Sequence, residues 1–318
     1  KLEHSGVRDM GVIGFDTINY TTSIAYLDGN NGINCSKLLP VKLGQLGLRQ
    51  SDAVFHHTNS LPELSDRLFS SLEEFSIDAV GVSTRPRAVE GSYMPCFLVG
   101  MSHARLLANA FGVELIECSH QQGHVAASLW SSSRMELMDE PHLAWHLSGG
   151  TTELLLVEPD GYNVKCTRIG GTTDISAGQL IDRTGQLLGL AFPAGKHLDA
   201  RSASAVRTDV FCPKCNESEF SLSGVQNKVQ QYYDQCKDPA ETAAYALRCV
   251  CAAVKKATIQ ANKAYPGLRT VFSGGVASNS MLRHAMADMD SIFCPAQYST
   301  DNAMGVAVLT KRAMEGAL

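Results

Sequence analysis

The sequence predicts an α/β protein made of two related halves. Segments with the pattern of buried strands alternate with segments of helical spacing along most of the chain, and such alternation is typical of the α/β class. A strand-turn-strand unit occurs twice, over residues 12–29 and 143–161, which indicates an internal duplication. The 318 residues, 44% hydrophobic and 19% charged, are enough for two units with separate cores.

Both copies of the repeated unit have the features of a hairpin. In each, a buried strand leads through a small-residue turn into a second apolar strand, which ends at Asp-Gly, over residues 28–29 and 160–161. Asp-Gly is a common hairpin signal. The turn of the second copy contains Ser-Gly-Gly at 148–150, and such turns can present backbone N–H groups to phosphate.

The remaining pattern supplies the other elements. It predicts helices over 61–75, 94–111, 175–190, 241–265 and 279–286, strands over 77–83, 113–118, 269–272 and 291–295, a loop rich in Ser, Pro and Cys over 194–220, and a closing helix from Asp301. We expect an N-terminal lobe over 10–140, with the closing helix 301–318 packed back on it, and a C-terminal lobe over 141–300.

Two such halves with glycine-bearing turns predict a cleft in which both hairpins hold a nucleotide. That is the plan of the actin, hexokinase and Hsp70 superfamily, the actin-like ATPase (ASKHA) fold. The alternative is that the Ser-Gly-Gly segments are only tight turns, as most isolated Gly-Gly pairs are.

Targeting signals and cysteines both favour a cytoplasmic protein with no membrane partner. No run approaches the roughly 18 apolar residues of a membrane span, and the first residues, KLEHSGVRDM, lack the apolar stretch of a signal peptide. We set that segment aside and expect the native chain to begin near Met10. The ten cysteines lie in apolar segments, where reduced and mostly buried thiols are expected.

The pair Cys212 and Cys215 has the spacing of a metal knuckle. No second pair at a matching spacing follows, whereas a structural zinc site needs about four ligands. The sequence therefore leaves the role of this pair open.

The formal net charge of −5 argues against binding of nucleic acid by the whole surface, because phosphate neutralisation needs clustered Lys and Arg. A tRNA substrate would require a local basic patch or the help of a partner protein.

Two histidines follow a predicted strand directly, in Ser-His-Gln-Gln-Gly-His at 119–124. On a helix His120 and His124 share one face, the spacing that lets two imidazoles bind one metal. The alternative is one capping histidine and one buried histidine. A zinc protease would carry Glu as general base directly after the first histidine, but this chain has Gln121, which cannot accept that proton.

Taken with the segments that follow it, this histidine motif resembles the TsaD family, whose members put threonylcarbamoyl on tRNA. The similar segments, in the family's order, are 119–124 (its Asn-His-x-x-Gly-His metal motif), 146–150, 174–182 with 188–195, 220–224 (Phe-Ser-Leu-Ser-Gly), 274–279 (Gly-Gly-Val-Ala-Ser-Asn) and 300–303. The resemblance spans nearly the whole chain from Gly11.

The resemblance implies a set of site residues and ligands. His120, His124 and Asp301 would hold one divalent metal, iron or zinc. The strand and turn of His146, Leu147, Ser148, Gly149 and Gly150 would hold the nucleotide-linked substrate, with the turn cradling phosphate. Asp182 would bind the ribose hydroxyls, and Gly195 and Asn279 would line the adenosine pocket. The ligand would be ATP or threonylcarbamoyl-AMP.

The implied activity is transfer of threonylcarbamoyl, or a related carbamoyl group, to N6 of the tRNA adenosine beside the anticodon. The family usually works in a protein complex or dimer, so partner proteins and tRNA are expected. A metallopeptidase, the activity once suggested for this family, is a further hypothesis. Gln121 argues against it.

The chain departs from the family pattern in three places. Tyr20 and Thr21 stand where members usually carry Asp-Glu, Thr151 replaces a histidine, and Gln179 replaces a glutamate. The loss of charged groups with retention of ligands and turns favours binding with altered chemistry. A non-catalytic nucleotide-binding partner is therefore the alternative to a transferase.

Overall fold

The computed structural model describes residues 10–40 and 48–316, arranged as two compact units. Of the described residues, 10–40, 48–130, 159–165 and 301–316 form the first unit, and 131–158 and 166–300 form the second. The segment that the sequence sets aside before Met10 lies outside the described residues.

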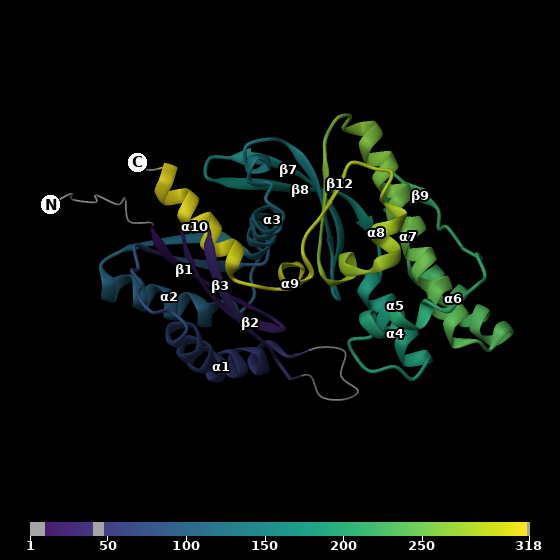
Figure 1. Ribbon diagram of the computed structural model, residues 1–318, viewed down its shortest axis with the longest axis horizontal. Helices are drawn as coiled ribbons and strands as arrows, with labels where there is room; N and C mark the ends of the chain where they lie inside the picture. Colours follow the sequence, from purple (N-terminus) through teal and green to yellow (C-terminus); the bar gives the residue numbers. More distant parts are fainter. Residues whose placement is uncertain (1–9, 41–47, 317–318) are drawn as a thin grey trace. The chain divides into compact units, whose positions relative to one another are not determined.

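A five-stranded sheet forms the centre of the first unit, in the order β3-β2-β1-β4-β5 (Figure 1). Strands β1 and β2 form an antiparallel hairpin, β3 extends it, and β4 and β5 run parallel to β1. The bounds are β1 Gly11–Ile18, β2 Thr21–Asp28, β3 Asn31–Leu38, β4 Ala79–Arg85 and β5 Glu114–Ser119.

Helices cover both faces of this sheet because side chains alternate along each strand. Ile13 and Phe15 of β1 join the core that α1 (Gln50–Ser70) and α2 (Phe97–Phe111) complete. Gly14, between them, faces α10 (Met304–Gly316), where an added Cβ would lie 2.7 Å from the Ala307 nitrogen. The closing helix therefore packs on β1, β2 and β4 (Figure 1).

The second unit is built on a seven-stranded sheet in the order β12-β11-β6-β7-β8-β10-β9. Strands β6 and β7 form an antiparallel hairpin, while β11 runs parallel to β6. The bounds are β6 His142–Leu147, β7 Thr152–Asp160, β8 Asn163–Thr172, β9 Cys215–Asn216, β10 Glu219–Phe220, β11 Thr270–Ser273 and β12 Ser291–Phe293.

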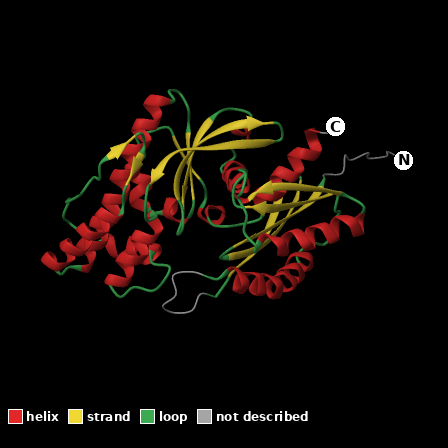
Figure 2. Ribbon diagram, turned by 180° about the vertical axis from the view of Figure 1, so that it is seen from behind, coloured by secondary structure: helices red, strands yellow, loops and turns green. Residues whose placement is uncertain are grey.

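The helices of the second unit gather beside its sheet (Figure 2). The longest, α7, begins after the N-cap Asp238 with Pro239 at its first position, an arrangement that favours helix initiation. The Trp145 indole donates to Thr258 Oγ1 at 2.9 Å and joins β6 to α7. The helices are α4 Ala177–Leu187, α5 Gly195–Ser202, α6 Ser223–Cys236, α7 Pro239–Ala264, α8 Ser280–Ala285 and α9 Ala296–Ser299, with short 3-10 turns η1 Met135–Met138 and η2 Gly275–Ser278.

Several predicted boundaries are wrong where polar residues hide the helical pattern. The helix predicted over 61–75 spans Gln50–Ser70, because its buried face includes the polar His57 and Ser60 and because Pro62 suggests a helix start. The predicted loop 194–220 contains α5, β9 and β10. Helix α5 buries only two side chains, Leu198 and Ser202, too few to produce a clear periodicity.

The elements α6 and β3 were not predicted for a related reason, and β8 was not predicted either. Helix α6 buries only Val225 and Val229, and β3 is largely exposed at the edge of its sheet.

None of the helices in the described part of the chain combines the length and apolar character that crossing a bilayer requires.

Candidate functional site

The candidate metal site is built on the first turn of α3 (His120–Ser131), which begins where β5 ends. Ser119 and Gln122 form a capping box: the Ser119 N–H donates to Gln122 Oε1 at 2.9 Å, and the Gln122 N–H donates to Ser119 Oγ at 3.3 Å. This arrangement fixes the start of a helix. It places His120 and His124 one turn apart, with ring centroids 4.4 Å apart.

Asp301 joins the two histidines. Its Oδ1 lies 3.1 Å from His124 Nε2 and 3.7 Å from His120 Nε2. The carboxylate sits just before α10, where the Asn302 side chain accepts from the Met304 N–H at 3.1 Å. Within the described ranges these three side chains form the one group that could hold a metal ion, with ligand atoms no more than 4.8 Å apart.

The donor set of this trio fits a divalent transition metal. Imidazole nitrogens and a carboxylate are usual ligands of zinc and of non-haem iron. Both imidazoles are buried, whereas the Asp301 side chain is partly exposed, so a small ligand could approach the trio from the side of the carboxylate. Three protein ligands leave coordination positions open for a substrate oxygen.

A second set of polar contacts surrounds the trio. The His120 Nδ1 lies 2.6 Å from Asp16 Oδ2, and Ser83 Oγ donates to Asp16 Oδ1 at 2.5 Å. Thr21 Oγ1 donates to Asp301 Oδ2 at 3.1 Å. Burial alone would lower the pKa of His120, but the charge and hydrogen bond of Asp16 and the charge of Asp301 outweigh it, so the pKa is raised.

The glycine turn between β6 and β7 offers an open backbone surface in the second unit. Thr151 N–H donates to Ser148 Oγ at 3.1 Å, and Ser148 N–H donates to the Thr151 carbonyl at 2.8 Å. Gly149 and Gly150 are exposed, and a Cβ on either would meet nothing within 4 Å. The turn is thus rigid at its ends and accessible at its tip.

The start of α4 packs directly against this turn. Ser176 Oγ donates to the Gly149 carbonyl at 2.6 Å, and a Cβ on Gly178 would lie 2.4 Å from the Ser148 oxygen. His146 and Leu147, at the end of β6, are buried. A side chain on Gly274, whose φ is +91°, would lie 2.1 Å from the Leu147 oxygen, so the glycine lets two turns approach closely.

Asp182 and Gly195 lie at the junction of α4 and α5. Asp182 Oδ1 accepts from the Ala194 N–H at 2.8 Å, immediately before Gly195. Burial raises the pKa of Asp182 despite this hydrogen bond. Asn279 caps α8 by accepting from the Leu282 N–H at 3.0 Å, and the next residue, Ser280, donates its N–H to Asp199 of α5 at 3.0 Å.

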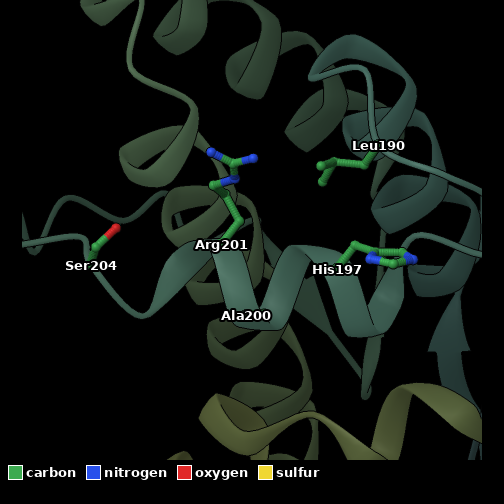
Figure 3. A pocket seen from close by; sticks show the side chains of 5 residues that line it. All are labelled: Leu190, His197, Ala200, Arg201 and Ser204. Carbon is green, nitrogen blue, oxygen red and sulfur yellow. The ribbon is translucent and has the colours of Figure 1, made fainter.

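A hollow of about 440 Å³ lies along one face of α5 (Figure 3). It is lined by Leu190, His197, Ala200, Arg201 and Ser204, none of which the sequence assigns to a site. Arg201 and His197 give this face two groups that can donate hydrogen bonds to an anion.

The histidines of α3 and the glycine turns lie within the part of the chain that one family model matches. The family model described as tRNA N6-adenosine threonylcarbamoyltransferase, TsaD, matches residues 46–308. The chain belongs to the TsaD family.

Relatives named tRNA N6-adenosine threonylcarbamoyltransferase match over most of the chain. The protein of Geobacillus thermodenitrificans is 32% identical over 249 residues, which cover 73% of this chain and 69% of the relative. The protein of Sulfurihydrogenibium sp. is 31% identical over 315 residues, which cover 94% of this chain and 89% of the relative.

Solved structures share the fold of this TsaD family member. T. kodakarensis HypF superposes with a TM-score of 0.63 at 13% identity, over 97% of this chain but only 49% of the HypF chain. The activator of 2-hydroxyisocaproyl-CoA dehydratase from Clostridium difficile, with bound ADPNP, gives a TM-score of 0.56 at 14% identity and covers 97% of both chains. These similarities confirm the predicted α/β fold of the actin-like class.

Two of the departures from the TsaD pattern have a structural role in this chain. Thr21 contacts Asp301, as described above, and Gln179 accepts from the Ser176 N–H at 3.1 Å in the capping box of α4. Tyr20 is 39% exposed in the turn between β1 and β2. Sequence reasoning missed Asp16 and Ser83 as contacts of the histidine site, although Asp16 is the one acidic residue of β1.

Proposed function

We propose that this chain transfers a threonylcarbamoyl group to N6 of a tRNA adenosine. The observation that carries the proposal is the trio His120, His124 and Asp301, brought together in a chain that belongs to the TsaD family. The related hypothesis of another carbamoyl group shares the same site residues.

The nucleotide site would lie in the second unit. Its ligand would be the donor threonylcarbamoyl-AMP, or ATP in the same place. The turn of Ser148, Gly149 and Gly150, exposed at its two glycines, would cradle phosphate, as backbone N–H groups in turns often do. The partly free Asp182 carboxylate would accept from ribose hydroxyls, and Gly195 and Asn279 would border the adenosine. His146 and Leu147 would position the turn, because they end the strand β6 that leads into it.

The metal would be one divalent ion, Fe or Zn, held by the two Nε2 atoms and Asp301. When bound, it would supply Lewis-acid polarisation of a carbonyl or phosphate oxygen. The residues of the chain orient the substrate and exclude water, since His120 and His124 are buried. We assign no catalytic base.

The acceptor would be tRNA, bound with the help of partner proteins in a complex or dimer. Because the chain has a net charge of −5, its surface as a whole provides little electrostatic attraction for the phosphates of tRNA. Because tRNA modification takes place where tRNA is found, we place this activity in the cytoplasm.

A non-catalytic nucleotide-binding partner is the second candidate function. Tyr20 and Thr21 replace two carboxylates of the family pattern, and acid-base chemistry often depends on such groups. Gln121 gives no support to a metallopeptidase, because an amide cannot act as the general base.

The test combines metal analysis, calorimetry and a transfer assay on the purified chain. Wild-type protein should bind one divalent ion and a non-hydrolysable mimic of threonylcarbamoyl-AMP (the adenylate mimic), and should label tRNA in the presence of the donor and partner proteins. His120→Ala should lose the metal, whereas His103→Ala, a histidine of α2 bonded to the Val99 carbonyl, should keep it. Tight nucleotide binding without any transfer would favour the second candidate, and unchanged metal content in His120→Ala would refute the ligand assignment.

A further inference from the structure

We propose that Thr21 and Asp16 are positioning residues, which determine the atoms that His120 and Asp301 present to the ion. The inference rests on the metal site of the proposed function. It concerns residues of β1 and β2 that the family resemblance does not assign to the metal.

Asp16 determines the orientation of the His120 ring. Its Oδ2 lies 2.6 Å from Nδ1 of the imidazole, while its Oδ1 accepts from Ser83 Oγ. With 2% of its surface exposed, Asp16 is held in place by these two protein contacts. An imidazole whose Nδ1 donates to a carboxylate presents Nε2 as its lone-pair nitrogen.

Thr21 performs the equivalent task for Asp301. Its hydroxyl donates to Oδ2 at 3.1 Å, while Oδ1 lies toward the Nε2 atoms of both histidines. One carboxylate oxygen is therefore engaged by the protein, and the other faces the histidines. Asp301 would bind the ion through Oδ1 alone, which leaves more coordination positions open for a substrate.

This role also gives Thr21 a function in the β1-β2 hairpin, where the family pattern has the pair Asp-Glu. Thr21 stands where the family pattern has an acidic residue, but it is 5% exposed and its hydroxyl contacts the third ligand. A hydroxyl orients a carboxylate without adding negative charge. The first hairpin of this chain therefore takes part in holding the metal rather than in proton transfer.

Thr22 provides a matched control on the same strand. It is fully buried, and its hydroxyl lies 2.7 Å from His57 Nδ1 rather than from a residue of the trio. Thr21→Val and Thr22→Val delete the same hydroxyl at neighbouring positions, and both replacements keep the shape of the side chain.

The experiment measures Zn²⁺ affinity of the full chain by competition with a chromophoric chelator, and the visible absorption spectrum of the Co²⁺ form. Thr21→Val should lower the Zn²⁺ affinity by about 10- to 100-fold, the usual effect of removing a residue that orients a ligand, and should shift the Co²⁺ spectrum. Thr21→Ser should restore both, and Thr22→Val should leave both unchanged.

Asp16→Asn is a second, independent variant, which keeps the size of the side chain and removes its charge. We expect its Zn²⁺ affinity to fall about tenfold with the thermal unfolding still cooperative. Wild-type affinity in folded Thr21→Val and Asp16→Asn, or a wild-type chain that binds no metal, would overturn the inference. A wild-type chain that binds metal as expected but never labels tRNA would refute the proposed transfer alone.

Discussion

Individual buried polar residues of the first unit are bonded to one another, and His57 is a clear case. The side chain is fully buried on α1, and its Nδ1 contacts Thr22 Oγ1. Among the described residues its Nε2 has no hydrogen-bond partner. Desolvation by burial lowers the pKa of His57 to about 4, although the charge of Asp16 opposes the change.

This lowered pKa predicts a loss of stability in acid. Because the folded protein disfavours the protonated imidazole, the stabilisation is complete above the ordinary pKa of about 6.5 and is lost as the pH falls toward about 4. Between about pH 7.5 and about pH 5, wild-type protein should lose roughly 2 kcal/mol of unfolding free energy more than His57→Gln. Urea unfolding at the two pH values measures it, and equal losses in both proteins would contradict the assignment.

Asp182 is the residue on which nucleotide affinity should depend most directly. Asp182→Asn keeps an oxygen for the Ala194 N–H but removes the charged acceptor for the ribose. Loss of a charged hydrogen bond, roughly 1.5–3 kcal/mol, should weaken binding of the adenylate mimic by about tenfold or more. Calorimetry checks this, with Asp238→Asn as control, since Asp238 caps α7 through the Ala240 N–H. Equal affinities in both variants would exclude the ribose role.

At the scale of elements, the close packing of α4 on the β6-β7 turn determines the shape of the backbone that we propose binds phosphate. Gly178 is the second residue of α4 and lies against Ser148 and Gly149. Gly224 is the second residue of α6, and a Cβ there would meet nothing within 4 Å. The two glycines thus occupy equivalent helix positions in different surroundings.

The pair predicts opposite effects of the same substitution. Gly178→Ala should displace the turn, destabilise the protein by about 1–3 kcal/mol and weaken binding of the adenylate mimic. Gly224→Ala should be neutral or stabilise by up to about 1 kcal/mol, since alanine favours the helix. Thermal unfolding and calorimetry distinguish them. Wild-type behaviour of Gly178→Ala would mean that the turn tolerates movement.

At the scale of the whole molecule, the two candidate sites belong to different units. All three metal candidates lie in the first unit, and all eight nucleotide candidates lie in the second. A ligand stabilises the state that binds it, by about 2.7 kcal/mol at a concentration a hundredfold above its dissociation constant.

Hydrogen exchange should therefore separate the two ligands. Zn²⁺ should slow exchange in α3 and at the start of α10, and ATP should slow exchange in the β6-β7 turn and the first turn of α4. Protection by ATP that is confined to α3 would contradict the assignment of nucleotide to the second unit. Chelation of the metal should lower the unfolding temperature of wild-type protein and leave that of His120→Ala unchanged.

The sequence by itself determined the fold class and the family. Its repeated hairpins are present as β1-β2 and β6-β7, and the largely buried helix α7 begins within two residues of its predicted start, because periodic burial leaves a direct record in the order of residues. The sequence likewise predicted that His120 and His124 lie close together, because both belong to one helix and are one turn apart.

Only the tertiary structure brought Asp301 to the histidines, 177 residues away in sequence from His124, and placed Asp16, Ser83 and Thr21 around them. These contacts depend on the pairing of β1 with β4 and on the packing of α10 against the same sheet. No local pattern encodes such distances. The weakly buried elements α5, α6 and β3 also became visible only in the structure, because few apolar side chains mark them.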